Sequence, residues 1–248
     1  MPTLQKLTVN YGFELIFNEA EHVYTIDGTM VPGVTTITDL FPKKALVPWA
    51  AKMTTEYLDG KWEAGKPYSA SEKAILLKEA KAAHRVKTKT AADYGSAAHE
   101  WIEQYIKTGQ RPPDPVIPEV LSSVTAFLEW EKAHRVEWLA SELRVASKEH
   151  MFAGTLDAMA VIDGWISLVD FKTSNAIYES HFVQTAGYMI GFEEGSPVAF
   201  NKRFILRFPK DGKGCEALEI PTSYVQDRQT FLAALEFYKC LRGYKSCL

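Results

Sequence analysis

Cysteine is scarce in this 248-residue chain. There are three, Cys215, Cys240 and Cys247, and no two of them form a C-x-x-C pair. This argues against a zinc ribbon and against a disulfide framework. An iron–sulfur cluster normally takes four thiolates, so we expect no such cluster. A reactive centre in this chain therefore has to use other side chains.

Long apolar runs and a strong positive charge are also missing. A hydrophobic content of 46% without a membrane-length run predicts a soluble globular protein. Residues 1–11 lack the charged-then-apolar pattern of a secretory signal, so we expect a cytoplasmic protein. The formal net charge of −3 gives no overall indication of nucleic-acid binding, because such domains are usually strongly basic.

One segment departs from this balance. Between residues 73 and 89, Glu79 is the one acid among the basic residues Lys73, Lys78, Lys81, Arg85, Lys87 and Lys89. Taken alone, such a run is more often the solvated face of a helix than a binding surface.

Apolar periodicity and turn residues predict an α/β chain. Alternation over residues 13–26 predicts a short sheet, and residues 34–58 read as helical with an interruption near Phe41-Pro42. Further helices are expected over 71–89, 93–107, 119–134, 179–193 and 223–241, and strands over 138–146, 151–162, 165–171 and 203–208. This order predicts a mixed central sheet flanked by helices rather than a doubly wound parallel sheet.

The dipeptide Asp163-Gly164 predicts a two-residue hairpin turn. If Ile162 pairs with Trp165, the same register places Asp157 opposite Asp170, with Lys172 on the same face as Asp170. Two carboxylates held this close repel each other unless a cation lies between them. The spacing therefore predicts a divalent metal site with a positive partner.

The triplet Asp170-Phe171-Lys172 is not informative as a string, because acid-x-lysine triplets also occur at Asp59-Gly60-Lys61, Glu79-Ala80-Lys81 and Asp211-Gly212-Lys213. It differs from them in ending an apolar strand and in having an acid across a hairpin. The alternative is that Asp157 is an ordinary strand residue paired with Lys172, but Asp170 would then stay unneutralised.

These residues resemble the PD-(D/E)XK nuclease superfamily, and specifically its RecB-type exonuclease branch. The motifs that carry the resemblance are Gly95-Ser96-Ala97-Ala98-His99, Glu142, Gly154-Thr155-Leu156-Asp157, Asp170-Phe171-Lys172-Thr173-Ser174, Gln184 and Tyr188. They span roughly residues 99–188, and residues 24–49 are similar to the leader of phage-encoded and mitochondrial-type exonucleases.

The resemblance implies a restriction-endonuclease-like core. It would be a single nuclease domain over 1–248, with an N-terminal helical and hairpin elaboration over 1–90, a catalytic core over 91–210 and a C-terminal helix over 211–248. The implied metal ligands are His99, Asp157, Asp170 and the main-chain carbonyl of Phe171, holding one or two Mg²⁺ or Mn²⁺ ions.

The resemblance also implies roles for the remaining residues. Lys172 would act with the two aspartates in catalysis, and Glu142 would be accessory. Phosphate contacts are expected from Gln184, Tyr188, Thr173 and Ser174, although Gln184 and Tyr188 also fit bracing of Lys172 or ordinary helix packing. Thr173 and Ser174 would alternatively cap the turn that follows Lys172. The basic segment becomes a candidate DNA path, formed by Lys78, Lys81, Arg85, Lys87 and Lys89.

The function implied is a metal-dependent exonuclease that hydrolyses phosphodiester bonds from DNA ends. A structure-specific endonuclease of the same fold is one alternative, and a catalytically inactive DNA-binding recombination module is another. DNA is the expected partner, with a recombination protein or further copies of the chain as additional candidates and no membrane. The expected location is the cytoplasm, which is the host cytoplasm if the protein is phage-encoded.

Overall fold

The computed structural model describes residues 9–208 and 214–245 of an α/β protein. The chain divides into two compact units. One contains the described residues up to Phe41 and from Ala98 onward, and the other is Pro42–Ala97. The Asp211-Gly212-Lys213 triplet and Cys247 lie outside the described residues. The other two cysteines, Cys215 and Cys240, are free thiols. None of the described helices is both long and apolar enough to cross a bilayer.

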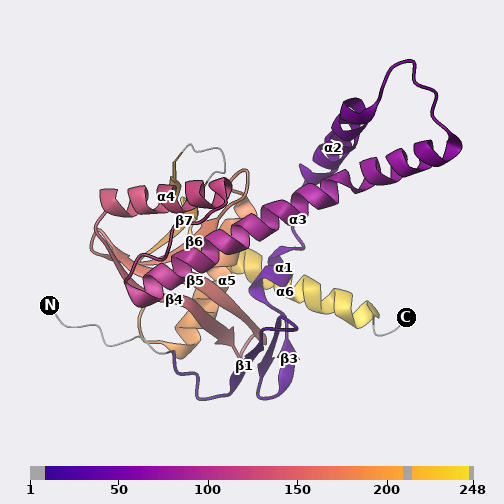
Figure 1. The fold of residues 1–248 in the computed structure, drawn as a ribbon. Helices are drawn as coiled ribbons and strands as arrows, with labels where there is room; N and C mark the ends of the chain where they lie inside the picture. Colours follow the sequence, from indigo (N-terminus) through magenta and orange to yellow (C-terminus); the bar gives the residue numbers. More distant parts are fainter. Residues whose placement is uncertain (1–8, 209–213, 246–248) are drawn as a thin grey trace. The chain divides into compact units, whose positions relative to one another are not determined.

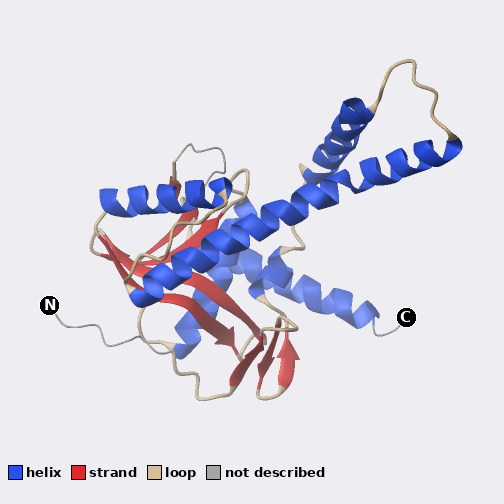
Figure 2. Ribbon diagram, in the orientation of Figure 1, coloured by secondary structure: helices blue, strands red, loops and turns tan. Residues whose placement is uncertain are grey.

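The first unit is built on a five-stranded mixed sheet, as the order of elements predicts (Figures 1 and 2). Its strands lie side by side in chain order: β4 (Val136–Ser147), β5 (Phe152–Ile162), β6 (Trp165–Lys172), β7 (Lys202–Arg207) and β8 (Glu216–Glu219). Neighbours are antiparallel except β6 and β7, which are parallel and are joined through α5 (Glu179–Gly195). β8 was not predicted from the sequence, because this short, mostly exposed strand has neither β-branched nor aromatic residues.

Helices cover this sheet on its two faces. On one face α5 packs on β4 and β5, and α6 (Tyr224–Lys245) packs on α5. On the other face Phe127 of α4 (Pro118–Ala133) lies about 6 Å, between ring centroids, from both Trp138 of β4 and Phe171 of β6. Because neighbouring strand residues point to opposite faces, Phe171 lies in this aromatic layer while Asp170 points toward α5.

Glycines let α5 approach its neighbours closely. A Cβ on Gly191 would lie 3.0 Å from the main-chain nitrogen of Ala146 in β4, and a Cβ on Gly187 would lie 2.5 Å from the ring of Phe231 in α6. Substitution at either position would push α5 away from the sheet or from α6. The helix that follows β6 is therefore held tightly in place.

A small antiparallel sheet precedes the core, in agreement with the predicted hairpin elaboration. It contains β1 (Leu15–Asn18), β2 (Val23–Ile26) and β3 (Thr29–Val31), followed by the short helix α1 (Val34–Thr38). The Tyr24 hydroxyl of β2 lies 2.8 Å from the Thr155 hydroxyl of β5, and Gly33 forms a bridge with Ala153. The small sheet is thereby attached to the strand that carries Asp157.

The second unit, Pro42–Ala97, contains α2 (Leu46–Lys61) and the first part of α3 (Ala70–Thr108). The prediction of two helices over 71–89 and 93–107 was wrong, because α3 is continuous. No proline falls between residues 89 and 93, and Lys89 forms an i,i+4 ion pair with Asp93 at 3.0 Å across the expected break.

Candidate active site

The turn between β5 and β6 has the predicted form. Ile162 pairs with Trp165, and the turn residues Asp163 and Gly164 both have positive φ, 51° and 91°. Two left-handed residues in sequence are the signature of the tight turn whose twist matches that of antiparallel strands. The predicted register is therefore confirmed from this turn as far as the pair Ala158 and Val169.

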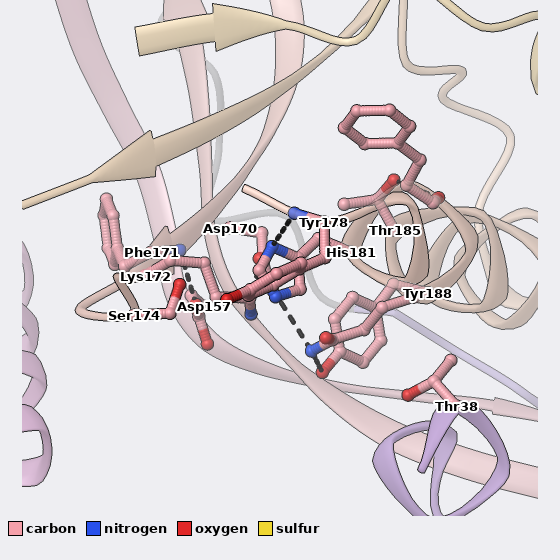
Figure 3. Close-up of polar contacts among 12 residues, drawn as sticks. Thr38, Asp157, Asp170, Phe171, Lys172, Ser174, Tyr178, His181, Thr185 and Tyr188 are labelled. Carbon is pink, nitrogen blue, oxygen red and sulfur yellow. Dashed lines mark hydrogen bonds and ion pairs between the residues drawn. The ribbon is translucent and has the colours of Figure 1, made fainter. Parts of the chain in front are cut away.

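The paired ladder ends one step before the two aspartates. Instead of a main-chain pair there, Oδ2 of Asp157 accepts a hydrogen bond from the main-chain N–H of Phe171 at 2.7 Å. β6 continues along β7, where Asp170 pairs with Ile205. The two aspartates thus stand where β5 and β6 separate, and Figure 3 shows both beside Lys172.

Asp170 and Lys172 form the closest charged contact of the site. Nζ of Lys172 lies 2.5 Å from Oδ2 of Asp170, whose side chain is fully buried. The alternative in which Lys172 pairs with Asp157 is therefore not what the structure contains. Lys172 is the one partner of Oδ2 among the described residues, because no other donor there forms a hydrogen bond with this oxygen.

Burial raises the pKa of both carboxyl groups. The pKa of Asp170 rises from 3.8 to about 6, because desolvation outweighs the opposing charge of Lys172 and the carboxylate of Asp157 adds to the rise. Burial likewise raises the pKa of Asp157, against the effect of Lys172. Without a cation the site therefore holds negative charge at an energetic disadvantage.

His99 reaches the same place from α3. Its Nδ1 lies 4.0 Å from Oδ2 of Asp157, and its ring meets the ring of Phe171 edge-on. Desolvation, followed by the nearby charge of Lys172, lowers the pKa of His99 to about 4. The imidazole is therefore neutral near pH 7, which is the form that binds metals.

Gln184 and Tyr188 lie one turn apart on α5 and both face inward. The amide of Gln184 donates to the Tyr188 hydroxyl at 2.8 Å and to Oδ1 of Asp170 at 3.3 Å. Both residues are buried, with exposed fractions of 9% and 3%. This geometry favours the bracing of Asp170 over a direct contact with substrate.

Gly154 is the first residue of the motif that ends at Asp157, and the packing of Tyr188 against it explains why this residue is glycine. A Cβ on Gly154 would lie 2.9 Å from the Tyr188 ring and 2.9 Å from the Val34 side chain. Such distances are too short for real Cβ contacts, so the close packing of α5 and α1 on β5 requires glycine here. Within this motif Gly154 thus allows close packing of the helices, and Asp157, three residues later, supplies the carboxylate.

Thr173 and Ser174 lie in the turn after β6 and are both half-buried. The Ser174 hydroxyl donates to the Ala176 carbonyl at 2.7 Å, and Arg207 donates to the Ser174 carbonyl at 3.3 Å. Ser174 therefore stabilises this turn through its own hydroxyl.

Glu142 stands beside Asp157 in the neighbouring strand. Its neighbours Ser141 and Leu143 pair with Ala158 and Leu156, which places Glu142 level with Asp157. Its φ of 52° is rare for a residue other than glycine and is a strained conformation within a strand. Burial and the charge of Asp157 raise its pKa to about 7.

Glu103 is a residue near this site that the sequence motifs did not identify. It lies one turn after His99 on α3, and its charge acts on both His99 and Glu142. The i,i+4 spacing from His99 was the available signal. An open cavity of about 660 Å³ adjoins the site and is lined by Val9, Phe17, Glu19, Glu103, Lys107, Glu142, Leu143, Arg144 and Thr155.

The residues fit a divalent ion held by few side chains. Across residues 9–208 and 214–245, no three His, Cys, Asp or Glu side chains are grouped as a complete ligand set. Mg²⁺ is often bound by one or two carboxylates and otherwise by water or main-chain oxygens. Asp157 and Asp170 supply the two carboxylates of that pattern, and the neutral His99 beside them adds an imidazole nitrogen.

The predicted DNA-path residues belong to the other unit. Lys78, Lys81, Arg85, Lys87 and Lys89 all lie on the part of α3 within Pro42–Ala97.

No family model matches the sequence, and no curated protein matches it. Among solved structures, the chain is similar to an alkaline exonuclease, LHK-Exo, from Laribacter hongkongensis, at 11% identity and a TM-score of 0.36, over 87% of this chain and 92% of that one. It is also similar to the protein SSO0001 at 15% identity and a TM-score of 0.31, over 80% of this chain and 87% of the other. Both similarities are too low to identify a function.

Proposed function

We propose that this protein is a metal-dependent nuclease that hydrolyses phosphodiester bonds from the ends of DNA. The observation that carries the proposal is the meeting of Asp157, Asp170 and Lys172 at the point where β5 and β6 separate, with a single lysine beside two buried carboxyl groups. Buried carboxylates with raised pKa values are typical of functional sites rather than of stabilising ion pairs.

Asp157 and Asp170 would hold Mg²⁺ or Mn²⁺, with His99 and the Phe171 carbonyl as further ligands. A bound divalent ion supplies a hydroxide nucleophile near neutral pH and neutralises charge on the phosphoryl oxygens. His99 suits Mn²⁺ in particular, because imidazole is a softer ligand than carboxylate.

Lys172 and the residues around it have separate tasks. Its ammonium group is anchored 2.5 Å from Asp170, from where it orients the attacking water or stabilises the negative charge that develops on phosphate. Gln184 fixes the other oxygen of Asp170 through its amide. Asp157 is fixed in turn by the Phe171 N–H, so both carboxylates are preorganised.

An inactive DNA-binding module is the less favoured reading. Such a protein would be expected to have lost a ligand or the lysine, and both aspartates and Lys172 are present together.

The test uses linear DNA labelled at one end, incubated with the purified protein and Mn²⁺ or Mg²⁺. We expect stepwise shortening that EDTA abolishes and that Lys172→Ala and Asp157→Ala reduce by at least about 100-fold, the scale of losing a group that stabilises the transition state. Lys239→Ala, at an exposed ion pair on α6, is the control that should retain activity. Full activity in a folded Lys172→Ala protein would contradict the proposal, and cleavage of closed circular DNA would indicate an endonuclease.

A further inference from the structure

The exposed side of α3 in the Pro42–Ala97 unit carries a row of positive charge. Lys78, Lys81, Arg85 and Lys89 follow one another at intervals of three, four and four residues, which places them on one face of the helix. All four are exposed. At 1.5 Å per residue the row is roughly 16 Å long.

This row faces away from α2. The residues of α3 that bond to α2 lie on its other side, where Glu79 accepts a hydrogen bond from Tyr57 at 2.9 Å and Lys87 pairs with Glu56 at 3.7 Å. Ala80 is buried on that side as well. Lys87 is therefore separate from the row, although the sequence grouped it with the others.

Most of the charge in the row is not neutralised. Lys89 is paired with Asp93, but Lys78, Lys81 and Arg85 have no carboxylate within ion-pair distance in the described part of the chain. Three uncompensated positive charges in a chain of net charge −3 indicate a surface for a polyanion.

The loop that joins α2 to α3 adds an aromatic surface. Trp62 and Tyr68 stack with ring centroids 4.9 Å apart and an angle of 21° between their planes. The Tyr68 hydroxyl accepts a hydrogen bond from the Glu63 N–H at 2.9 Å, which fixes the tyrosine in the loop. Trp62 is 58% exposed, so much of the indole remains open to a further planar group.

We propose that the Pro42–Ala97 unit binds single-stranded nucleic acid, with the row of Lys78, Lys81, Arg85 and Lys89 along the phosphates and Trp62 stacked on a base. A charged groove or face combined with an exposed aromatic side chain is the usual way proteins bind single strands. Bases in a duplex are stacked on each other and are not available to Trp62. The inference names the form of DNA handled by the proposed nuclease and rests on that function, but it concerns a different unit of the chain and is measured without catalysis.

The test measures fluorescence anisotropy of a labelled 20-nucleotide oligothymidine and of a sealed hairpin duplex, in EDTA, with the full-length protein. We expect tighter binding of the single strand. Lys78→Gln/Lys81→Gln/Arg85→Gln should weaken it at least tenfold and reduce the slope of log affinity against log salt by about 2, since each phosphate contact on a single strand contributes about 0.7. Trp62→Ala should weaken it roughly tenfold, while Trp62→Phe keeps most of the affinity because it keeps a ring for stacking.

The matched control removes three positive charges elsewhere. Lys132→Gln/Lys239→Gln/Arg242→Gln changes exposed residues outside the second unit and should alter affinity less than twofold. Circular dichroism checks that each variant is folded. Equal loss of affinity in both triple variants, or unchanged binding in the first, would overturn the inference, as would tighter binding of the hairpin duplex or of anionic phosphatidylserine vesicles than of the single strand.

The two proposals fail in different ways. If the inference is wrong and the nuclease proposal right, the Lys78/Lys81/Arg85 variant binds and digests DNA like the parent. If the nuclease proposal is wrong and the inference right, the parent binds the single strand, the same variant loses that binding, and no hydrolysis occurs with Mn²⁺.

Discussion

Nζ of Lys172 lies 2.5 Å from Oδ2 of Asp170, a carboxylate that is fully buried and has Asp157 as its neighbour in charge. Lys172 is one positive charge beside two buried carboxyl groups. When both carboxyl groups are ionised, one negative charge has no positive partner. Burial is the main reason why the pKa of Asp170 stays raised although a lysine is in contact with it, and the charge of Asp157 adds to the rise. A divalent cation would neutralise this second carboxylate. The stability of the metal-free protein should therefore depend on pH and on substitution of either aspartate.

The first prediction concerns pH and the stability of the metal-free protein. The pKa of Asp170 is about 6 in the folded state against an ordinary 3.8, so the folded protein binds this proton more tightly than the unfolded chain does. Protonation of Asp170 therefore stabilises the folded protein relative to the unfolded chain. This contribution to the free energy of unfolding is fully present below about pH 4 and is lost as pH rises through about 6. Urea unfolding of the Asp170→Asn and parent proteins between pH 5 and 8 measures it. The difference between the two proteins in free energy of unfolding should change across this pH range. A constant difference would contradict the raised pKa of Asp170.

The second prediction concerns metal binding. The ion competes with the proton on Asp170, so Mn²⁺ should raise the melting temperature more at pH 8 than at pH 5.5. Differential scanning fluorimetry with and without Mn²⁺ at about 1 mM, the order of the dissociation constants of weak divalent-ion sites, measures the shift. Asp157→Asn should abolish it at both pH values, whereas Glu236→Gln, at an exposed ion pair on α6, should retain it.

The third prediction separates stability from function at Asp157. Its burial raises its pKa, so an uncharged isostere is better tolerated in the metal-free protein than the carboxylate is. Asp157→Asn should therefore unfold at a higher urea concentration than the parent at pH 8 in EDTA, and should be inactive. The Asn side-chain oxygen still accepts the Phe171 N–H. A strongly destabilised Asp157→Asn protein would show that the carboxylate is structural.

The sequence predicted the parts of this site that depend on local rules. Asp163-Gly164 correctly predicted the turn and the register as far as the pair Ala158 and Val169, one step before Asp157 and Asp170, where the ladder ends. The inward orientation of Gln184 did not follow, because an i,i+4 pair on a helix looks the same whether it faces a substrate or a carboxylate. Glu142 lies level with Asp157 only because the β4 register shifts between Trp138 and Ala140, an irregularity that periodicity does not reveal.

The prediction of helices and strands was limited in the same way, because it used only local sequence patterns. Long buried strands such as β5 were predicted within a residue or so, whereas the exposed β8 was missed and α3 was divided in two. In each case of failure the deciding contact is with another part of the chain or spans the expected break, as the Lys89 and Asp93 pair does.

The fourth prediction tests the packing role of Gly154. Gly154→Ala places a methyl group 2.9 Å from both Tyr188 and Val34 and should destabilise the protein by about 1–3 kcal/mol, the usual range for overpacking. Because Tyr188 accepts the Gln184 hydrogen bond, activity should fall as well. Gly60→Ala is the matched control: its Cβ would have no neighbour within 4 Å, and alanine favours the α2 helix. Unfolding midpoints of the two variants should therefore move in opposite directions.

The last prediction concerns the buried pair of Arg203 and Asp227, which joins β7 to the helices behind the site. Arg203 donates to Asp227 at 2.7 Å and to the Phe182 carbonyl, two residues before Gln184, at 3.1 Å. Removing one partner leaves an uncompensated buried charge, so Arg203→Met and Asp227→Leu should each cost about 3–5 kcal/mol, while the double variant should cost much less than their sum. Urea unfolding measures the cycle, and additive losses would contradict direct coupling. Because Arg203 also fixes the first turn of α5, the double variant should recover stability without recovering full nuclease activity, which distinguishes the charge pair from its effect on Gln184.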